Sequence, residues 1–159
     1  MTGRVPVGSH GAVSWFKKES ERVADGLEAV HDDILRLARQ IEFHADLAPY
    51  PFMAERLKKI SGDEERSARL IGDRLMALGR QPSIAPSGAI RTGRNSWERL
   101  IQDTDDYRAL LRRLSQLWVR WDDESTEDAA VVRSVLDAAT RHRDELNDLV
   151  ARSDPHALD

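Results

Sequence analysis

The positions of the chain-breaking residues limit what this sequence can fold into more than any other feature. Its six prolines all lie outside four long stretches rich in alanine, leucine, arginine and acidic residues, which favour helices. A proline inside a helix removes a backbone hydrogen bond and clashes with the preceding turn. We therefore predict helices over about residues 14–48, 52–78, 96–121 and 126–152, after a flexible arm at residues 1–13.

The lengths of the three connections predict how these helices are arranged. The first and third are short, so the first two helices and the last two should form antiparallel hairpins. The middle connection, residues 80–94, can span about 50 Å when extended, which exceeds the roughly 38 Å of such a helix. It can therefore cross the bundle and start the third helix parallel to the second. The alternative is a loose loop that closes an up-down-up-down bundle, but structureless loops of this length are uncommon.

Composition narrows the functions that such a helical domain can serve. The chain has no cysteine, which excludes disulfides, thiolate metal sites and thiol nucleophiles and fits a reducing cytoplasm. Its formal charge of −4 argues against nucleic-acid binding. No apolar run approaches the roughly 20 residues of a membrane span. We therefore expect one cytoplasmic four-helix bundle over residues 14–155 of the 159.

Two charged residues interrupt the apolar stripes of the predicted helices. A bundle helix repeats apolar residues at spacings of three and four, and the second and fourth helices do so except at Glu64 and His142. A buried carboxylate or imidazole is unfavourable unless it is paired, hydrogen-bonded or metal-bound. His31 flanks the stripe of the first helix, and Tyr107, beside Asp106, occupies the comparable level of the third. These residues are the candidates for a buried polar site.

The order of these features resembles the ferritin-like (rubrerythrin-type) four-helix domains over about residues 20–155. The layout of hairpin, crossover and hairpin is one point of resemblance. Residues 63–71 (DEERSARLI) are similar to the family's Glu-x-x-His motif on the second helix, and residues 141–155 are similar to its fourth helix and tail. The resemblance implies an all-α fold of two antiparallel hairpins joined by a long crossover between the second and third helices.

The metal-ligand pattern of that family is only partly present in this chain. In the family, one Glu from each of two helices and a Glu-x-x-His pair from each of the other two hold two metal ions. On the second helix this chain keeps Glu64 but has Ser67 at the histidine position. On the fourth helix it keeps His142 but has Ala139 at the glutamate position. The resemblance therefore implies a degenerate dimetal site.

The resemblance also places candidate ligands on the other two helices. The position on the first helix falls near His31, and the position on the third falls near Asp106 or Tyr107. The candidate ligands, for one ion of iron, manganese or zinc, are therefore His31, Glu64, Asp106 and His142. We favour a metal-free hydrogen-bonded pair of Glu64 and His142, because a charge-assisted pair satisfies both groups without an ion.

Two functions from different classes remain open at this point. The favoured hypothesis is a bundle that has lost its full dimetal centre and works, without a cofactor, as a non-catalytic structural or interaction protein. It would act as a homo-oligomer, with a dimer expected first, or through a protein partner. The alternative is a ferritin-like oxidase or iron-handling protein that binds iron, manganese or zinc with a reduced ligand set. A four-helix bundle unrelated to ferritins is the third alternative.

Overall fold

The fold was examined in a computed structural model that describes residues 10–121, 127–153 and 156. Within these ranges all regular structure is helical, in α1 (His10–Asp46), α2 (Pro51–Ala77), α3 (Ser96–Trp121) and α4 (Glu127–Arg152). Helix α1 begins at His10, so residues 10–13, expected in the arm, are helical. The remainder of the expected arm, residues 1–9, lies outside the described residues. No helix in the described part is long and apolar enough to cross a membrane.

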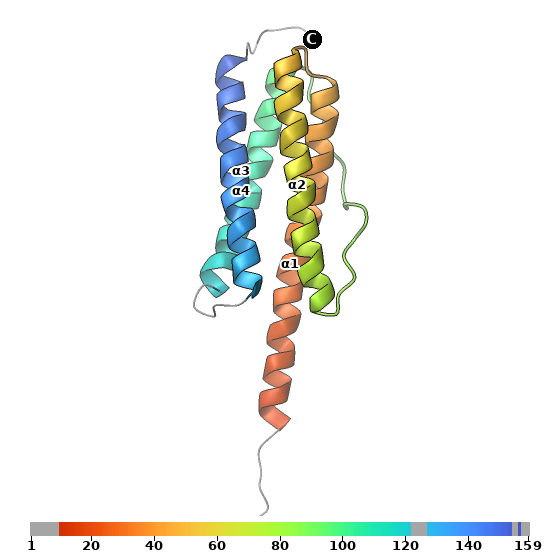
Figure 1. Ribbon diagram of the computed structural model, residues 1–159, viewed down its shortest axis with the longest axis vertical. Helices are drawn as coiled ribbons and strands as arrows, with labels where there is room; N and C mark the ends of the chain where they lie inside the picture. Colours follow the sequence, from red (N-terminus) through yellow and green to blue (C-terminus); the bar gives the residue numbers. More distant parts are fainter. Residues whose placement is uncertain (1–9, 122–126, 154–155, 157–159) are drawn as a thin grey trace, which may run out of the picture.

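The path of the chain confirms the predicted crossover (Figure 1). Helices α1 and α2 run in opposite directions, and so do α3 and α4. The connection between the pairs, which we call the strap (residues 78–95), runs along the outside of the bundle. It starts α3 at the end of the bundle where α2 also starts, so these two helices are parallel. The up-down-up-down alternative is therefore wrong.

Local chemistry sets the ends of the helices that flank the strap. Helix α2 begins at Pro51, whose missing N–H is not needed in a first turn, and Gly79 follows it with a φ of +78°. Helix α3 begins with a cap in which the Glu98 backbone N–H donates to the Asn95 side chain at 2.8 Å. The Glu98 carboxylate in turn accepts from the Arg94 backbone N–H at 2.6 Å. These caps fix where the strap leaves and rejoins the bundle.

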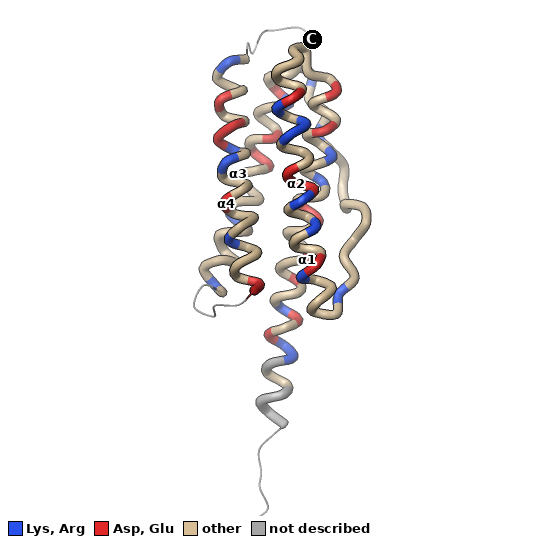
Figure 2. Tube along the Cα trace, in the orientation of Figure 1, with Lys and Arg blue, Asp and Glu red and all other residues tan. Residues whose placement is uncertain are grey.

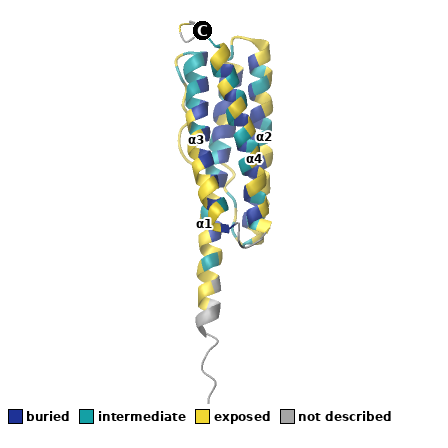
Figure 3. Ribbon diagram, turned by 90° about the vertical axis from the view of Figure 1, so that its left-hand side faces the viewer, coloured by how far each residue is buried: buried dark blue, intermediate teal, exposed yellow. Residues whose placement is uncertain are grey.

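The core follows the apolar stripes along all four helices (Figure 3). Buried positions face inward and exposed positions face outward, while the N-terminal part of α1 extends beyond the end of the bundle. The largest fully buried side chains include Trp121, Tyr107, Leu27, Ile34, Leu57 and Ile71. Basic and acidic residues are interspersed along the helices (Figure 2). Helix α1 packs against α2 and α3, and α4 packs against the same two helices.

The strap is held to α1 at several points along its length. Near its start, the Arg80 guanidinium pairs with Asp25 at 2.7 Å and with Glu28 at 3.0 Å. At its middle, the Ser87 backbone N–H donates to the Asp32 carboxylate at 2.8 Å. The contacts near its end, at Arg91, reach buried side chains of α1 and are described below. The strap is therefore an ordered part of the fold.

Candidate functional site

A buried hydrogen-bonded group at the middle of the bundle joins three helices. It consists of Glu64, Tyr107 and His142, and together with Asp63 we call it the central cluster. Glu64 of α2, which is 0% exposed, accepts at its Oε1 atom from the Tyr107 hydroxyl of α3 at 2.7 Å. The same oxygen lies 2.7 Å from Nδ1 of His142 on α4. The Tyr107 oxygen and His142 Nδ1 are 3.4 Å apart, with the two rings edge to face. One carboxylate oxygen thus connects α2, α3 and α4.

The other edge of the His142 ring reaches a second carboxylate. Its Nε2 atom lies 3.2 Å from Oδ2 of Asp63, which also pairs with Arg66 one turn along α2. Both ring nitrogens of His142 therefore lie within hydrogen-bond distance of carboxylate oxygens, which holds the ring between Glu64 and Asp63. The central cluster thus extends from the buried Tyr107 hydroxyl to the half-buried Asp63.

Electrostatics keep the central cluster in one hydrogen-bonding state. Burial, reinforced by the charge of the Glu64 carboxylate and the hydrogen bond to it, raises the pKa of Tyr107 well above its ordinary value of 10.0. Tyr107 is therefore a neutral donor at physiological pH. The second Glu64 oxygen, Oε2, is buried and has no hydrogen-bond partner among the described residues. An unpaired buried oxygen is costly, so this atom is the weak point of the cluster.

The residues around Glu64 do not fit a two-metal carboxylate centre. Helix α3 supplies the Tyr107 phenol, and the two motif positions Ser67 and Ala139 are buried without offering a carboxylate or an imidazole. Across the described ranges, no group of three or more His, Asp or Glu side chains is arranged to hold a metal ion. We therefore derive no metal chemistry from this arrangement.

Of the four candidate ligands, the structure brings Glu64 and His142 together but not His31 or Asp106. His31 packs beside Gly72 of α2, which is two helical turns beyond Glu64, and a Cβ added at Gly72 would lie 3.5 Å from its Nε2 atom. Asp106 is adjacent in sequence to Tyr107, so the two side chains point in directions about 100° apart around α3. Since Tyr107 faces Glu64, Asp106 faces α1.

Asp106 belongs to a second buried group, the strap cluster, which consists of Gln40 and His44 of α1, Asp103 and Asp106 of α3, and the backbone of Arg91. The Gln40 amide donates to Asp103 and to Asp106, both at 2.8 Å. Nδ1 of His44 lies 3.0 Å and 2.9 Å from the two oxygens of Asp103. The Arg91 backbone closes the group: its N–H donates to Gln40 at 2.8 Å, and its carbonyl oxygen lies 2.7 Å from His44 Nε2.

The geometry of the strap cluster requires a proton between His44 and Asp103. A carbonyl oxygen can only accept, so His44 Nε2 must donate to Arg91. The Nδ1 edge then faces the Asp103 carboxyl group, and a hydrogen bond there needs a second proton on one of the two partners. Burial raises the pKa of Asp103, although the hydrogen bond and charge of His44 oppose the shift. The His44–Asp103 contact thus joins α1 to α3, and the bonds of Arg91 to His44 and Gln40 join the strap to α1.

Sequence reasoning missed Gln40, His44 and Asp103. A signal for the last two was present, because His44 follows the stripe residue Ile41 by three positions and Asp103 precedes Tyr107 by four. Both spacings place the side chain on the inward face of its helix. His44 and Asp103 would therefore have suggested a second buried pair of polar residues.

Comparison with known proteins gives a fold but no sequence family. No protein-family model matches the chain, and no curated protein sequence matches it. Among solved structures, the Desulfovibrio desulfuricans bacterioferritin has a TM-score of 0.76 at 19% identity, over 85% of this chain and 81% of its own. Mycobacterium tuberculosis bacterioferritin BfrA has a TM-score of 0.76 at 22% identity, over 82% of this chain and 84% of its own.

A third solved structure is similar to this chain to the same degree. The dodecameric thioferritin of Bacteroides fragilis, described as a bacterioferritin-related protein, has a TM-score of 0.76 at 17% identity. The match covers 84% of this chain and 86% of that one. Identities this low establish the shared architecture alone. Together with the parallel α2 and α3 and the strap between them, they show that this chain has the ferritin-like four-helix-bundle fold.

Proposed function

We propose that this protein is a non-catalytic, self-associating bundle of ferritin-like fold, in which hydrogen bonds take the place of a dimetal centre. The observation that carries the proposal is the double use of Glu64 Oε1, which binds both the Tyr107 hydroxyl and His142 Nδ1 at 2.7 Å. Tyrosine on α3 supplies a proton donor where a metal site needs another ligand. The cluster thereby links three helices without an ion.

A reduced metal site is the second candidate, and a different observation favours it. Glu64 Oε2 is buried without a partner, and His142 and Asp63 lie next to the same carboxylate. A single iron, manganese or zinc ion could bind there with two carboxylates and one imidazole after the hydrogen bonds rearrange. Iron is the first metal to test, since the D. desulfuricans bacterioferritin is described as having a diiron site.

Metal analysis separates the two candidates. We expect protein purified without chelator to contain far less than one equivalent of iron, manganese or zinc, with a thermal unfolding midpoint that chelator leaves unchanged. A near-stoichiometric metal content that disappears in His142→Ala would contradict the proposal and support the reduced site. Arg141→Ala, a change of the exposed neighbour, is the matched control.

Restoring the missing ligands provides a positive control for the same argument. The combined changes Ser67→His, Tyr107→Glu and Ala139→Glu would rebuild the ligand pattern that the family resemblance implies on α2, α3 and α4. We expect this variant to bind iron or zinc and to gain thermal stability from it, while the wild type does not. If both proteins took up equal metal, the Tyr107 hydrogen bond would not be what excludes the ion.

Self-association is the part of the proposal that the ferritin-like fold supports most directly. The B. fragilis neighbour is described as dodecameric, and we propose a homo-oligomer for this chain, with a dimer as the smallest unit. Tyr50 and Phe52, which are 55% and 50% exposed, stack at the α1–α2 turn with ring centroids 5.8 Å apart. Such exposed aromatic residues suit an interface with another copy or with a protein partner.

Light scattering after size exclusion tests the assembly. We expect a species of at least twice the mass of the chain in the wild type, and a smaller one in a Tyr50→Ser, Phe52→Ser variant. A wild type that stays monomeric at high concentration would contradict self-association, and a larger species unaffected by the two changes would place the interface elsewhere. We also propose a cytoplasmic location, which the absence of cysteine fits.

A further inference from the structure

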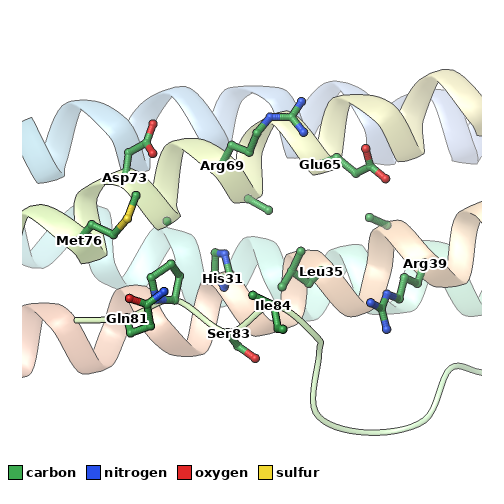
Figure 4. A pocket seen from close by; sticks show the side chains of 14 residues that line it. His31, Leu35, Arg39, Glu65, Arg69, Asp73, Met76, Gln81, Ser83 and Ile84 are labelled. Atoms are coloured by element: carbon green, nitrogen blue, oxygen red, sulfur yellow. The ribbon is translucent and has the colours of Figure 1, made fainter.

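A groove lies on the outside of the bundle between α1, α2 and the strap, away from both buried clusters (Figure 4). Its volume of about 410 Å³ falls in the range of small-molecule sites. Its lining is mainly apolar, with Leu35 from α1, Met76 from α2 and Ile84 from the strap. Ile84 is 93% exposed, so an apolar side chain remains uncovered at the mouth of the groove.

A single imidazole without a partner lines this groove. His31 is only 5% exposed, and none of the described residues forms a hydrogen bond with its ring. Its Nε2 atom faces the gap above Gly72, where an added Cβ would lie 3.5 Å from it. Burial lowers the pKa of His31, against the raising effects of Asp32 and Glu28, so the ring is neutral at physiological pH. The His31 ring nitrogens are not among the enclosed unpaired atoms of the described residues, so the ring opens on the groove and can bond to a ligand there.

The charges at the groove favour a small anion with an apolar body. Arg39 of α1 and Arg69 of α2 line opposite walls, and neither forms an ion pair with another described residue. Glu65 and Asp73, which precede and follow Arg69 by four residues on α2, also line the groove, so an anion would be bound by the two guanidinium groups rather than by an excess of charge. Guanidinium groups bind carboxylates and also stack on aromatic rings, and a methionine sulfur such as that of Met76 packs well against such rings.

We propose that this groove is a binding site for an aromatic monocarboxylate. The carboxylate accepts a hydrogen bond from His31 and lies toward Arg69, Arg39 adds positive charge farther along the groove, and the ring system lies against Met76, Pro82 and Ile84. The ligand thereby provides the partner that His31 lacks in the folded chain. The site is independent of the central cluster, so it can exist whether or not the proposed non-catalytic role is correct.

Two glycines of α2 offer a matched test. Gly72→Ala would place a methyl group 3.5 Å from His31 Nε2 and 3.7 Å from Pro82, which closes the gap without a clash. Gly62→Ala would meet nothing within 4 Å. Both changes replace a helical glycine by alanine, so both should raise the midpoint of urea unfolding. Only Gly72→Ala should affect the ligand.

The probe is naphthoate, measured by isothermal titration calorimetry and by NMR of the His31 ring, with uncharged naphthyl methanol as the comparison. We expect saturable binding of naphthoate to the wild type and to Gly62→Ala, and binding at least about tenfold weaker to Gly72→Ala, as expected for a lost charge-assisted hydrogen bond. Bound naphthoate should also move the pKa of His31 upward. His31→Phe should keep the fold and lose the preference for naphthoate over naphthyl methanol.

Three results would overturn the proposal. Absence of saturable naphthoate binding would remove the site, and equal binding of naphthoate and naphthyl methanol would remove the role of His31 and the arginines. Unchanged binding by Gly72→Ala, with its unfolding midpoint raised as in Gly62→Ala, would place the ligand elsewhere on the protein. Because both alanine variants should fold better than the wild type, loss of binding in one of them cannot be ascribed to unfolding.

Discussion

The central cluster and the strap cluster each bury a carboxylate among helices, but they differ in how many of its oxygens are hydrogen-bonded. In the strap cluster both oxygens of Asp103 have a partner: Oδ1 lies within hydrogen-bond distance of Gln40 and His44, and Oδ2 of His44. In the central cluster all contacts of Glu64 go to one oxygen, and Oε2 has no partner in the described part of the chain. The difference indicates that the strap cluster is built for stability and that the central cluster is not optimised for it.

The two clusters also differ in what they connect. The central cluster joins side chains of α2, α3 and α4, which already pack through their apolar stripes. The strap cluster joins α1 and α3 to the backbone of Arg91, in a segment that has few apolar contacts of its own. Loss of the strap cluster should therefore loosen the crossover, whereas loss of the central cluster should leave the path of the chain intact.

Asp103→Ala should give the largest effect. It leaves His44 and Gln40 buried without their acceptor, and since each such unsatisfied group typically costs about 1–3 kcal/mol, we expect a loss of about 3–5 kcal/mol of unfolding free energy. Urea denaturation would measure the loss, with Asp105→Ala, a change of the exposed neighbour, as the control expected to cost about 0.5 kcal/mol or less. A loss below about 1 kcal/mol for Asp103→Ala would mean that the strap cluster does not stabilise the fold.

Glu64→Ala should cost less, about 2 kcal/mol, although Glu64 is buried as deeply as Asp103. The change removes the acceptor of Tyr107 and His142, but it also removes the unpaired Oε2 oxygen, and that gain offsets part of the loss. The same denaturation series, with Glu65→Ala as the exposed control, checks the ranking. A cost equal to that of Asp103→Ala would show that an unseen partner, such as a bound water or ion, satisfies Oε2.

The fold was predictable from the sequence because its signals are local. Proline and glycine clusters mark the helix ends, and stripes of three and four spacing mark the buried faces, so the crossover followed from the length of residues 80–94. Glu64 and His142 could be singled out because each stands alone in an apolar stripe. The strap cluster could not, since the Arg91 backbone carries no sequence signal and its partners lie 47 and 51 positions away.

The choice between Asp103 and Asp106 shows a second limit of the sequence. The spacing of four from Tyr107 places Asp103 rather than Asp106 on the inward face, but it does not say which groups pair with a carboxylate buried there. The outcome depends on α1, where Gln40 and His44 stand opposite Asp103 and provide its partners. Polar residues of this kind are placed by tertiary contacts, which a single sequence does not reveal.

Alkaline pH should separate the clusters through Tyr107, with a smaller effect. Because its folded pKa is raised above 10.0, its contribution to stability is complete below pH 10 and is lost as pH rises toward the folded pKa. Above pH 10, Tyr107→Phe should lose unfolding free energy less steeply than the wild type, by up to about 1.4 kcal/mol per pH unit. Tyr107→Phe is expected to be the less stable protein at pH 7. The unfolding free energies of the wild type and the variant should therefore converge as the pH rises above 10.

The chain's second tyrosine is the control for this measurement. Comparing Tyr50→Phe with the double variant Tyr50→Phe, Tyr107→Phe removes any contribution of Tyr50, so the difference between the two alkaline slopes belongs to Tyr107. Parallel curves for the wild type and Tyr107→Phe above pH 10 would mean that the Tyr107 hydroxyl ionises as freely in the folded protein as in the unfolded one. The Tyr107–Glu64 hydrogen bond would then not describe the protein in solution.

The smallest expected effect tests which part of Arg91 holds the strap. Its side chain, 45% exposed, lies 3.5 Å from Asp106, while its backbone N–H and carbonyl bond to the buried Gln40 and His44. Exposed ion pairs contribute little, so Arg91→Ala should cost about 0.5 kcal/mol or less in urea denaturation, because it retains both backbone bonds. A loss above about 1.5 kcal/mol would mean that the guanidinium–Asp106 pair fastens the strap. The strap cluster would then resemble a surface salt bridge, and its contrast with the central cluster would disappear.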